Sequence, residues 1–208
     1  MGKKNFLWLQ KHKKDHYFKL AKARGYRSRS AFKLLQIARR YDLLKKGKKA
    51  VDLGAAPGGW TQIASEIVGE QGYILSIDKK HMKSFNSKNV ETLVMDVNDR
   101  SIVNTILEKA NGKVYALISD LSPSISGVRS LDNSRQIHLA MVSFEIAKKV
   151  LDKKGNFLVK IFDSPDAQEF FKKVKMYFKK TKIIKPDASK KESSEIYIVA
   201  INYQNQKL

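Results

Sequence analysis

The chain has 208 residues, 42% of them hydrophobic, which is enough for one α/β domain with a full core. It contains no cysteine, and this excludes disulfides, thiolate zinc sites, iron–sulfur clusters and a cysteine nucleophile. No apolar run approaches the roughly 20 residues of a membrane span, and the first residues lack the apolar region of a signal peptide. We therefore expect a cytoplasmic protein that does not enter a membrane.

The net charge of +21 arises from 41 Lys and Arg residues against 20 Asp and Glu residues. Residues 1–49 alone hold 17 basic residues and two acids, a net charge of +15. Such a surface suits a polyanion, because each neutralised phosphate releases counterions. A generally lysine-rich proteome would also give a basic chain, but the concentration at one end favours a nucleic-acid partner.

The first 26 residues are predicted to form a basic arm that precedes a single domain, residues 27–208. The aromatic side chains of the arm could stack on bases or could fasten the arm to the domain; they are Phe6, Trp8, Tyr17, Phe18 and Tyr26. A helix is expected over residues 30–41, with Ser28 or Ser30 as its cap and Phe32, Leu35 and Ile37 on its apolar face.

A regular alternation of strands and helices follows. Strands are expected at residues 50–53, 73–77, 92–95, 114–119 and 157–162, and helices at 60–68, 100–110, 132–151 and 165–180. The last helix carries an apolar stripe of Phe170, Val174, Tyr177 and Phe178, with Ser164 as its cap, and residues 79–91 read as a loop. Residues 182–185 and 196–202 read as a closing antiparallel pair. The pattern predicts a Rossmann-like α/β fold, a mostly parallel seven-stranded sheet with an antiparallel last strand and helices on both faces.

A glycine-rich turn joins the first strand to its helix, within Val51-Asp52-Leu53-Gly54-Ala55-Ala56-Pro57-Gly58-Gly59-Trp60. Glycines there let the backbone turn sharply and approach a ligand closely. The spacing of Gly54, Gly58 and Gly59 is not the dinucleotide fingerprint. With Asp52 inside the strand, the turn better suits a cofactor with a cationic amino-acid end, such as S-adenosylmethionine; an ordinary tight turn is the alternative.

Three further strands end in an acid, namely Asp78, Asp96 and Asp120. A single aspartate after a strand is usually a helix cap or a turn former. Three in succession, beside the glycine turn at one sheet edge, indicate a ligand site. Asp78 is placed to take ribose hydroxyls, Asp96 to face the adenine edge and Asp120 to face the reactive end of the cofactor.

The strand at residues 157–162 carries Lys160 in the middle of an apolar run. A lysine there must find a partner, or lose its charge, or reach to the sheet edge. In the functional interpretation, burial and a second cation make it a proton acceptor near neutral pH. Glu195, at the start of the last strand, is an available counter-charge, although it could equally be an ordinary solvated residue.

Five ordered motifs resemble the FtsJ/RrmJ family of S-adenosylmethionine-dependent RNA ribose 2′-O-methyltransferases. They are Arg27-Ser28-Arg29-Ser30-Ala31-Phe32-Lys33-Leu34, the glycine turn, Ser119-Asp120-Leu121-Ser122-Pro123, Val159-Lys160-Ile161-Phe162 and Ser194-Glu195-Ile196-Tyr197. The resemblance implies a catalytic tetrad of Lys33, Asp120, Lys160 and Glu195. It also implies cofactor contacts at Gly58, Trp60, Asp78, Asp96 and Asp120.

The short form of the chain is similar to members that methylate a uridine of large-subunit ribosomal RNA, as free RNA or within the ribosomal subunit; a tRNA methylase of the same family is the alternative. In the mechanism that this resemblance suggests, Lys160 takes the proton of the 2′-hydroxyl, Lys33 lies nearby, and Asp120 and Glu195 orient the two ammonium groups. We expect a monomer and no metal.

Other classes fit less well. Pyrimidine C5 methylation uses a cysteine nucleophile, which is absent, and the segment after Asp120 lacks the aromatic residue usual in exocyclic amine methylation. A small-molecule methyltransferase would not need the basic arm. A non-enzymatic RNA-binding protein would explain the charge, but it gives no purpose to Lys160 or to the ordered acids.

Overall fold

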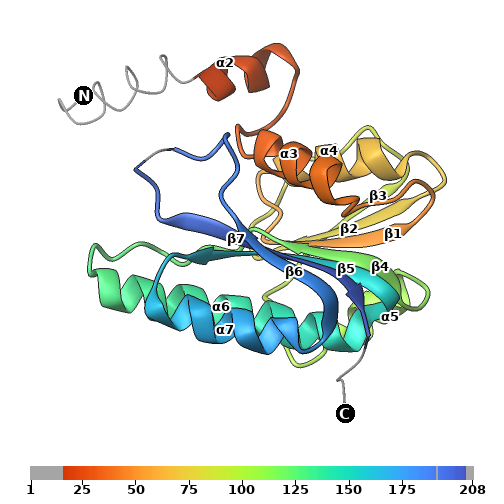
Figure 1. The fold of residues 1–208 in the computed structure, drawn as a ribbon. Coiled ribbons are helices and arrows are strands. Elements are labelled where there is room, and N and C mark those ends of the chain that lie inside the picture. Colours follow the sequence, from red (N-terminus) through yellow and green to blue (C-terminus); the bar gives the residue numbers. More distant parts are fainter. Residues whose placement is uncertain (1–15, 191, 205–208) are drawn as a thin grey trace.

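The computed structural model describes residues 16–190 and 192–204, so residues 1–15 of the predicted arm lie outside the described part of the chain. The centre of the molecule is a seven-stranded sheet in the order β3-β2-β1-β4-β5-β7-β6 (Figure 1). The strands are β1 Lys49–Leu53, β2 Tyr73–Asp78, β3 Val90–Val94, β4 Val114–Ser119, β5 Leu151–Phe162, β6 Phe178–Ile184 and β7 Glu195–Tyr203.

Strand direction confirms the predicted fold class. β1 pairs in parallel with β2 and β4, and the parallel pairing extends to β3 on one side and to β5 on the other. β7 is antiparallel to both of its neighbours, β5 and β6. β7 therefore begins at the edge of the sheet where the parallel strands end.

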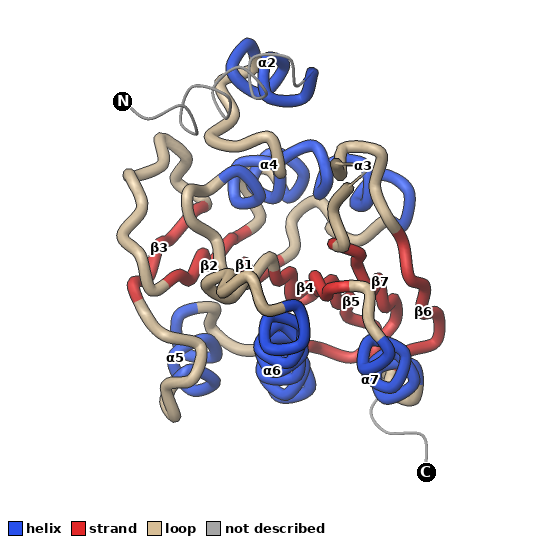
Figure 2. The backbone as a smooth tube through the Cα atoms, turned by 90° about the vertical axis from the view of Figure 1, so that its left-hand side faces the viewer, coloured by secondary structure: helices blue, strands red, loops and turns tan. Residues whose placement is uncertain are grey.

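Helices cover both faces of the sheet (Figure 2). They are α2 His16–Ala23, α3 Ala31–Tyr41, α4 Gly59–Val68, α5 Ile102–Lys109, α6 Arg129–Val150 and α7 Pro165–Lys175. α3 and α4 lie on one face, and α5, α6 and α7 lie on the other; α2 lies outside α3 (Figures 1 and 2). The segment after β2 has no helix, as predicted.

Each face of the sheet has its own apolar core. On the side of α3 and α4, fully buried side chains of the sheet pack against Trp60 and Ile63, and the largest of them is Tyr197. On the other side, Phe144 of α6 and Phe157 of β5 belong to an aromatic group that includes Phe170. These two cores fix the sheet between its helices and so hold the strand ends in place.

The boundary between α7 and β6 differs from the prediction, which continued the helix to residue 180. α7 ends at Lys175, and β6 begins at Phe178 rather than at residue 182. Phe178 stacks on Phe157 and contacts Tyr203, so its apolar character belongs to a strand face. Where a strand directly follows a helix, its first buried apolar residue can continue the apolar spacing of the helix, so the sequence pattern does not show the boundary.

The start of β5 is also longer than predicted. Leu151 pairs with Val114, and the next paired residue is Asn156, opposite Ala116, so residues 152–155 form an irregularity in the ladder. These four residues contain no large apolar side chain, which is why the hydrophobic pattern showed the strand only from residue 157. α6 begins at Arg129 instead of residue 132, and β3 spans residues 90–94 instead of 92–95.

Ser30 and Ser164 occupy the N-cap positions of α3 and α7, as predicted, but their hydroxyl groups do not bond to the helix ends. Ser28 and Ser30 hydrogen-bond to each other through their hydroxyl groups. In the part of the chain that the structure describes, no helix is both long and apolar enough to cross a bilayer.

Candidate active site

Two lysines, each paired with one acid, meet where the parallel strands end. Lys33 Nζ lies 2.5 Å from Glu195 Oε2. Lys160 Nζ lies 3.2 Å from Asp120 Oδ1 and donates to the backbone carbonyl of Asp120 at 2.8 Å. The structure thus brings together all four residues of the predicted tetrad, as two ion pairs.

Tyr197 joins the two pairs. Its hydroxyl accepts a hydrogen bond from Lys33 Nζ at 3.3 Å and donates one to Asp120 Oδ1, also at 3.3 Å. The tyrosine side chain is fully buried, and its ring packs against Trp60 with the ring centroids 5.8 Å apart. The four charged groups and this hydroxyl form one continuous network.

Strand register explains how residues far apart in the sequence come together. Tyr197 of β7 pairs directly with Lys160 of β5, and Glu195 pairs with Phe162. Glu195 and Tyr197 are two residues apart on the strand and so point to the same face. Asp120 immediately follows β4, the other neighbour of β5. Lys33 reaches this face from the first turn of α3.

The two lysines are strongly buried, with 8% of Lys33 and 4% of Lys160 exposed. A buried ammonium group is tolerated only with charged or hydrogen-bonding partners, and each lysine has both. Burial raises the pKa of Glu195, but Lys33 and, more weakly, Lys160 outweigh it, so that this pKa lies below its ordinary value. Burial and the two acids raise the pKa of Tyr197 well above its ordinary value, so its hydroxyl stays protonated and can donate.

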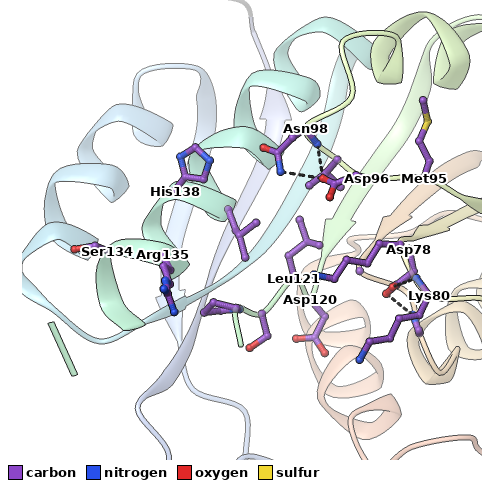
Figure 3. Close-up of a pocket in the computed structure, with 17 residues that line it drawn as sticks. Asp78, Lys80, Met95, Asp96, Asn98, Asp120, Leu121, Ser134, Arg135 and His138 are labelled. Carbon is purple, nitrogen blue, oxygen red and sulfur yellow. Dashed lines mark hydrogen bonds between the residues drawn. The ribbon is translucent and has the colours of Figure 1, made fainter. Parts of the chain in front are cut away.

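A cavity of about 570 Å³ adjoins this network, and Asp120 belongs to both (Figure 3). Gly54, Asp78 and Asp96 of the predicted cofactor set also line it. Asp78 is held by the backbone amides of Ala56 at 3.0 Å and Lys80 at 2.8 Å. Hydrogen bonds from the backbone and then the side-chain amide of Asn98 lower the pKa of Asp96. The acids that line the cavity are therefore fixed in position before any ligand binds.

Gly54 shows why a glycine must stand at the end of β1. Its φ is +75°, and a Cβ built there would lie 2.9 Å from both the Cα and the amide nitrogen of Leu121. Since both contacts are with backbone, a side chain could not be accommodated by a rotamer change. The close crossing of the turns after β1 and β4 forms one wall of the cavity.

Gly58, Gly59 and Trp60, also predicted to contact the cofactor, do not line this cavity. A Cβ on Gly59 would lie 2.1 Å from Ser28 Oγ, and the Trp60 indole donates to the Ser30 carbonyl at 2.9 Å. The packing of residues 28–30 against α4 thus explains why a glycine stands at position 59 and a tryptophan at position 60. Contact between these three residues and the cofactor stays a prediction.

Asp52 does not reach the cavity either. Its carboxyl group is completely buried and accepts a hydrogen bond from Thr61 Oγ1 at 2.8 Å, and Thr61 in turn shares one with Ser76. Burial raises the pKa of Asp52 to about 7. The sequence-based idea that this acid favours a cationic cofactor group is therefore not supported by its position, which is inside the strand–helix packing.

A profile of the FtsJ-like methyltransferase family matches residues 26–203. The chain belongs to this family. As an FtsJ-like methyltransferase it is an enzyme that uses S-adenosylmethionine. The residues that line the cavity agree with that cofactor, because three carboxylates lie at one edge of the sheet, next to the turn at Gly54, where there is no room for a Cβ.

Curated relatives of this FtsJ-like methyltransferase match nearly its whole length. A protein of Methanothermobacter thermautotrophicus named ribosomal RNA large subunit methyltransferase E is 40% identical over 206 residues, covering 99% of this chain and 96% of the relative. Proteins with the same name in Methanocaldococcus jannaschii and Coxiella burnetii are 41% and 42% identical and cover 100% and 93% of this chain, and 86% and 92% of their own lengths.

Solved structures agree with the fold. A Plasmodium falciparum protein assigned as a ribosomal RNA methyltransferase superposes with a TM-score of 0.75 at 25% identity, over 86% of this chain and 98% of its own. A Thermotoga maritima S-adenosylmethionine-dependent O-methyltransferase, at 16% identity, reaches a TM-score of 0.57 over 85% of this chain and 66% of its own, which shows likeness of fold alone.

Besides Tyr197, two residues that hold the site of this methyltransferase were not identified as site residues from the sequence. Gln136, almost fully buried on α6, donates to the carbonyls of Leu121 at 3.1 Å and Lys160 at 2.9 Å. A polar residue on the buried face of a predicted helix was a signal that could have found it.

Arg27 is the second. Its guanidinium donates to the carbonyls of Pro57, Lys83 and Ser84 and lies 3.7 Å from the ring centroid of Phe85. It thereby ties the glycine turn to the loop after β2. Arg27 opens the first of the five motifs that resemble the family, and this was a signal that could have found it.

Proposed function

We propose that this protein transfers the methyl group of S-adenosylmethionine to the ribose 2′-hydroxyl of a nucleotide, a uridine, in large-subunit ribosomal RNA. The observation that carries the proposal is the position of Asp120, which lines the cavity and pairs with Lys160. Lys160, which could accept or donate a proton, would thus lie next to the cavity that we assign to S-adenosylmethionine. The names of the curated relatives support the ribosomal RNA substrate.

Different residues of the site would bind different parts of the cofactor. We assign Asp78 to the ribose hydroxyls and Asp96 to the adenine edge, with Asp120 at the reactive end. Gly58, Gly59 and Trp60, at the start of α4, are assigned to the amino-acid end, where the amino terminus of a helix favours a carboxylate. Bound S-adenosylmethionine supplies an electrophilic methyl group; the protein supplies position and proton transfer.

For the catalytic roles, we propose that Lys160, in its neutral amine form after loss of a proton to solvent, accepts the proton of the 2′-hydroxyl as this oxygen attacks the methyl group. Lys160 Nζ contacts both the carboxylate and the backbone carbonyl of Asp120, and these two oxygens would stabilise the ammonium that the transfer forms. Glu195 restrains Lys33, which would then orient the ribose oxygen. Because an ion pair also favours a lysine that stays charged, the competing role for Lys160 is electrostatic positioning of the nucleotide.

The RNA would approach over the basic N-terminal region, which we propose to be an arm, residues 1–26, on a single domain, residues 27–208. In the described part of this region, five basic side chains of α2, α3 and their connection are exposed: Lys19, Lys22, Arg24, Arg39 and Arg40. We expect RNA affinity to fall on the order of 10³-fold between 50 and 200 mM salt if several phosphates are contacted. We further propose that the protein acts as a monomer in the cytoplasm, on RNA of the large ribosomal subunit.

The deciding experiment maps 2′-O-methylation in total RNA from cells with and without the gene. We expect one site in large-subunit ribosomal RNA to disappear and to return when purified protein and S-adenosylmethionine are added. Loss of a tRNA site instead would move the substrate to tRNA. An unchanged map would refute methyl transfer to a ribose 2′-hydroxyl of cellular RNA.

Calorimetry tests the cofactor site separately. Asp78→Ala should weaken binding of S-adenosylmethionine about 10- to 100-fold, because it removes a charged acceptor. Asp152→Ala is the matched control, since Asp152 is exposed in the irregular part of β5, away from the cavity. Equal affinities of the two variants would contradict the assignment of Asp78.

A further inference from the structure

The connection between β4 and α6, together with the first turn of α6, presents large aliphatic side chains to solvent. Ile125 is 65% exposed, Val128 56% and Leu131 41%. These three account for nearly half of the exposed large hydrophobic residues in the part of the chain that the structure describes. Single exposed aliphatic residues are ordinary, but three within seven positions form a patch, and a patch marks an interaction surface.

Residues 122–131, named the β4–α6 loop, comprise the end of this connection and the first three residues of α6, and they are held in a defined shape. The Asp132 carboxylate accepts hydrogen bonds from the amide and hydroxyl of Ser126, both at 2.8 Å, and from the amide of Gly127 at 3.2 Å. Asp132 itself is only 7% exposed. The aliphatic side chains are therefore directed outward by a fixed backbone.

Both ends of the β4–α6 loop border the cavity. Ser122 and Pro123 line it before the exposed residues. Ser134 and Arg135, labelled in Figure 3, line it after them. Gln136 ties the root of the loop to β5 through its bonds to the carbonyls of Leu121 and Lys160. The patch is thus joined at both ends to residues that line the cavity.

The charge around the patch suits a nucleic acid. Arg129 and Arg135 are exposed, whereas the one acid between residues 121 and 138, Asp132, is turned inward to the loop backbone. Aliphatic side chains with neighbouring arginines can insert between bases while the arginines contact phosphates. Insertion would separate the target nucleotide from its stacked neighbour and expose its 2′-hydroxyl.

We propose that the β4–α6 loop is a wedge that inserts Ile125, Val128 and Leu131 beside the target nucleotide and unstacks it. The wedge rests on the RNA methyltransferase function proposed above and deepens it. It assigns to this enzyme a substrate in which the target base is stacked before binding and displaced afterwards.

The test uses a hairpin RNA that contains the mapped methylation site, with 2-aminopurine in place of the adjacent base, and S-adenosylhomocysteine in excess. 2-Aminopurine fluoresces more strongly when it is unstacked. We expect the unchanged protein to raise the fluorescence. The triple variant Ile125→Ala, Val128→Ala, Leu131→Ala should lose most of this rise and bind the hairpin about tenfold more weakly, because aliphatic groups buried in the complex are removed.

Two controls separate the wedge from general effects. Met176→Ala removes another exposed apolar side chain, 51% exposed and at the opposite edge of the sheet, and should change neither signal. The triple variant should keep the slope of log affinity against log salt, since aliphatic contacts release no counterions, whereas Arg129→Ala should reduce this slope by about one.

The outcomes distinguish the wedge from the function on which it rests. If, with S-adenosylmethionine, the unchanged protein methylates neither the hairpin nor large ribosomal subunits from cells without the gene, the proposed function fails. If it methylates either substrate but does not raise the fluorescence of the hairpin, or if the triple variant gives the same rise, the wedge is overturned. Loss of a dimer by the triple variant in sedimentation, with RNA affinity unchanged, would assign the patch to a second copy of the chain and also overturn it.

Discussion

Substitution of Lys160 gives the sharpest test of the site, because the structure shows what each replacement keeps. Lys160→Met keeps an unbranched apolar stem but removes both ammonium contacts to Asp120. Within the network, the Asp120 carboxylate then keeps the hydrogen bond from the Tyr197 hydroxyl. Lys160→Arg keeps the charge and can still pair with Asp120, but it cannot give up a proton in the accessible pH range.

The magnitude follows from burial. Breaking a buried ion pair by removing one partner destabilises a protein by about 3–5 kcal/mol. The Lys160 side chain is 5% exposed but that of Asp120 is 20% exposed, so water can partly replace the lost partner and the lower value applies. About 3 kcal/mol corresponds to a fall in Tm of roughly 6–12 °C in a chain of this size. Lys160→Arg should recover part of this loss.

Turnover separates the two roles of Lys160 when methyl transfer to the hairpin RNA is measured at saturating cofactor. If Lys160 accepts the proton, both variants should lose about 10²-fold or more in kcat, and activity of the unchanged protein should rise with pH along one ionisation. Lys180→Met, at an exposed position of β6, is the control and should change the free energy of unfolding by less than about 0.5 kcal/mol. Near-normal turnover by the arginine variant would refute the proton-acceptor role and leave Lys160 as an electrostatic positioner.

Three further results are expected. Tyr197→Phe keeps the ring and removes the hydroxyl that joins the two ion pairs, so kcat should fall by about tenfold with cofactor affinity unchanged; an equal loss in both would contradict a role in the network. The pKa of Asp52 is about 7 in the native protein against an ordinary 3.8, so its contribution to stability is complete below pH 4 and is lost as pH rises to 7. Between pH 4 and pH 8, the free energy of unfolding of Asp52→Asn, measured by calorimetric melting, should therefore increase relative to that of the unchanged protein by on the order of 4 kcal/mol. If the two proteins show the same dependence of this free energy on pH, the prediction is wrong. Gly54→Ala should lower both Tm and cofactor affinity because its Cβ meets the Leu121 backbone, whereas Gly47→Ala, with φ of +72° but open space, should cost about 1 kcal/mol and leave the affinity intact.

The sequence predicted those features of the fold that depend on local periodicity. Parallel strands that are buried on both faces appear in the sequence as apolar runs, and an acid at the end of such a run interrupts it. The sheet and the positions of Asp78, Asp96 and Asp120 could therefore be predicted from the sequence. Lys160 stood out because a charge inside such a run needs an explanation. The pairing of each lysine with one particular acid could not be foreseen, because it depends on the reach of side chains from four different elements.

Features that depend on register or on close packing were missed for the same reason. Tyr197 becomes a bridge only because β7 places it opposite Lys160, and neither residue reveals that pairing by itself. Gly59 looked like a residue for ligand approach, but the nearest atoms to its missing side chain belong to Ser28, 31 positions earlier in the chain. A glycine in a sequence indicates that a side chain at this position would not fit, but it does not indicate whether a ligand or another part of the chain occupies the space.

The direction of β7 is what makes this arrangement of charges possible. An antiparallel strand begins where its parallel neighbours end, so its first residues, Glu195 and Tyr197, face the same edge as Asp120. Two buried ammonium groups would be prohibitive alone, but two carboxylates at that edge make the set of four electrically neutral. Neutrality permits burial, and burial keeps water away from the ion pairs, so each contact between Lys160 and Asp120 acts in a weakly screened environment. The same residues therefore hold the strand ends together and provide the groups that would act on the 2′-hydroxyl, which is why we expect Lys160 substitutions to change stability and turnover together.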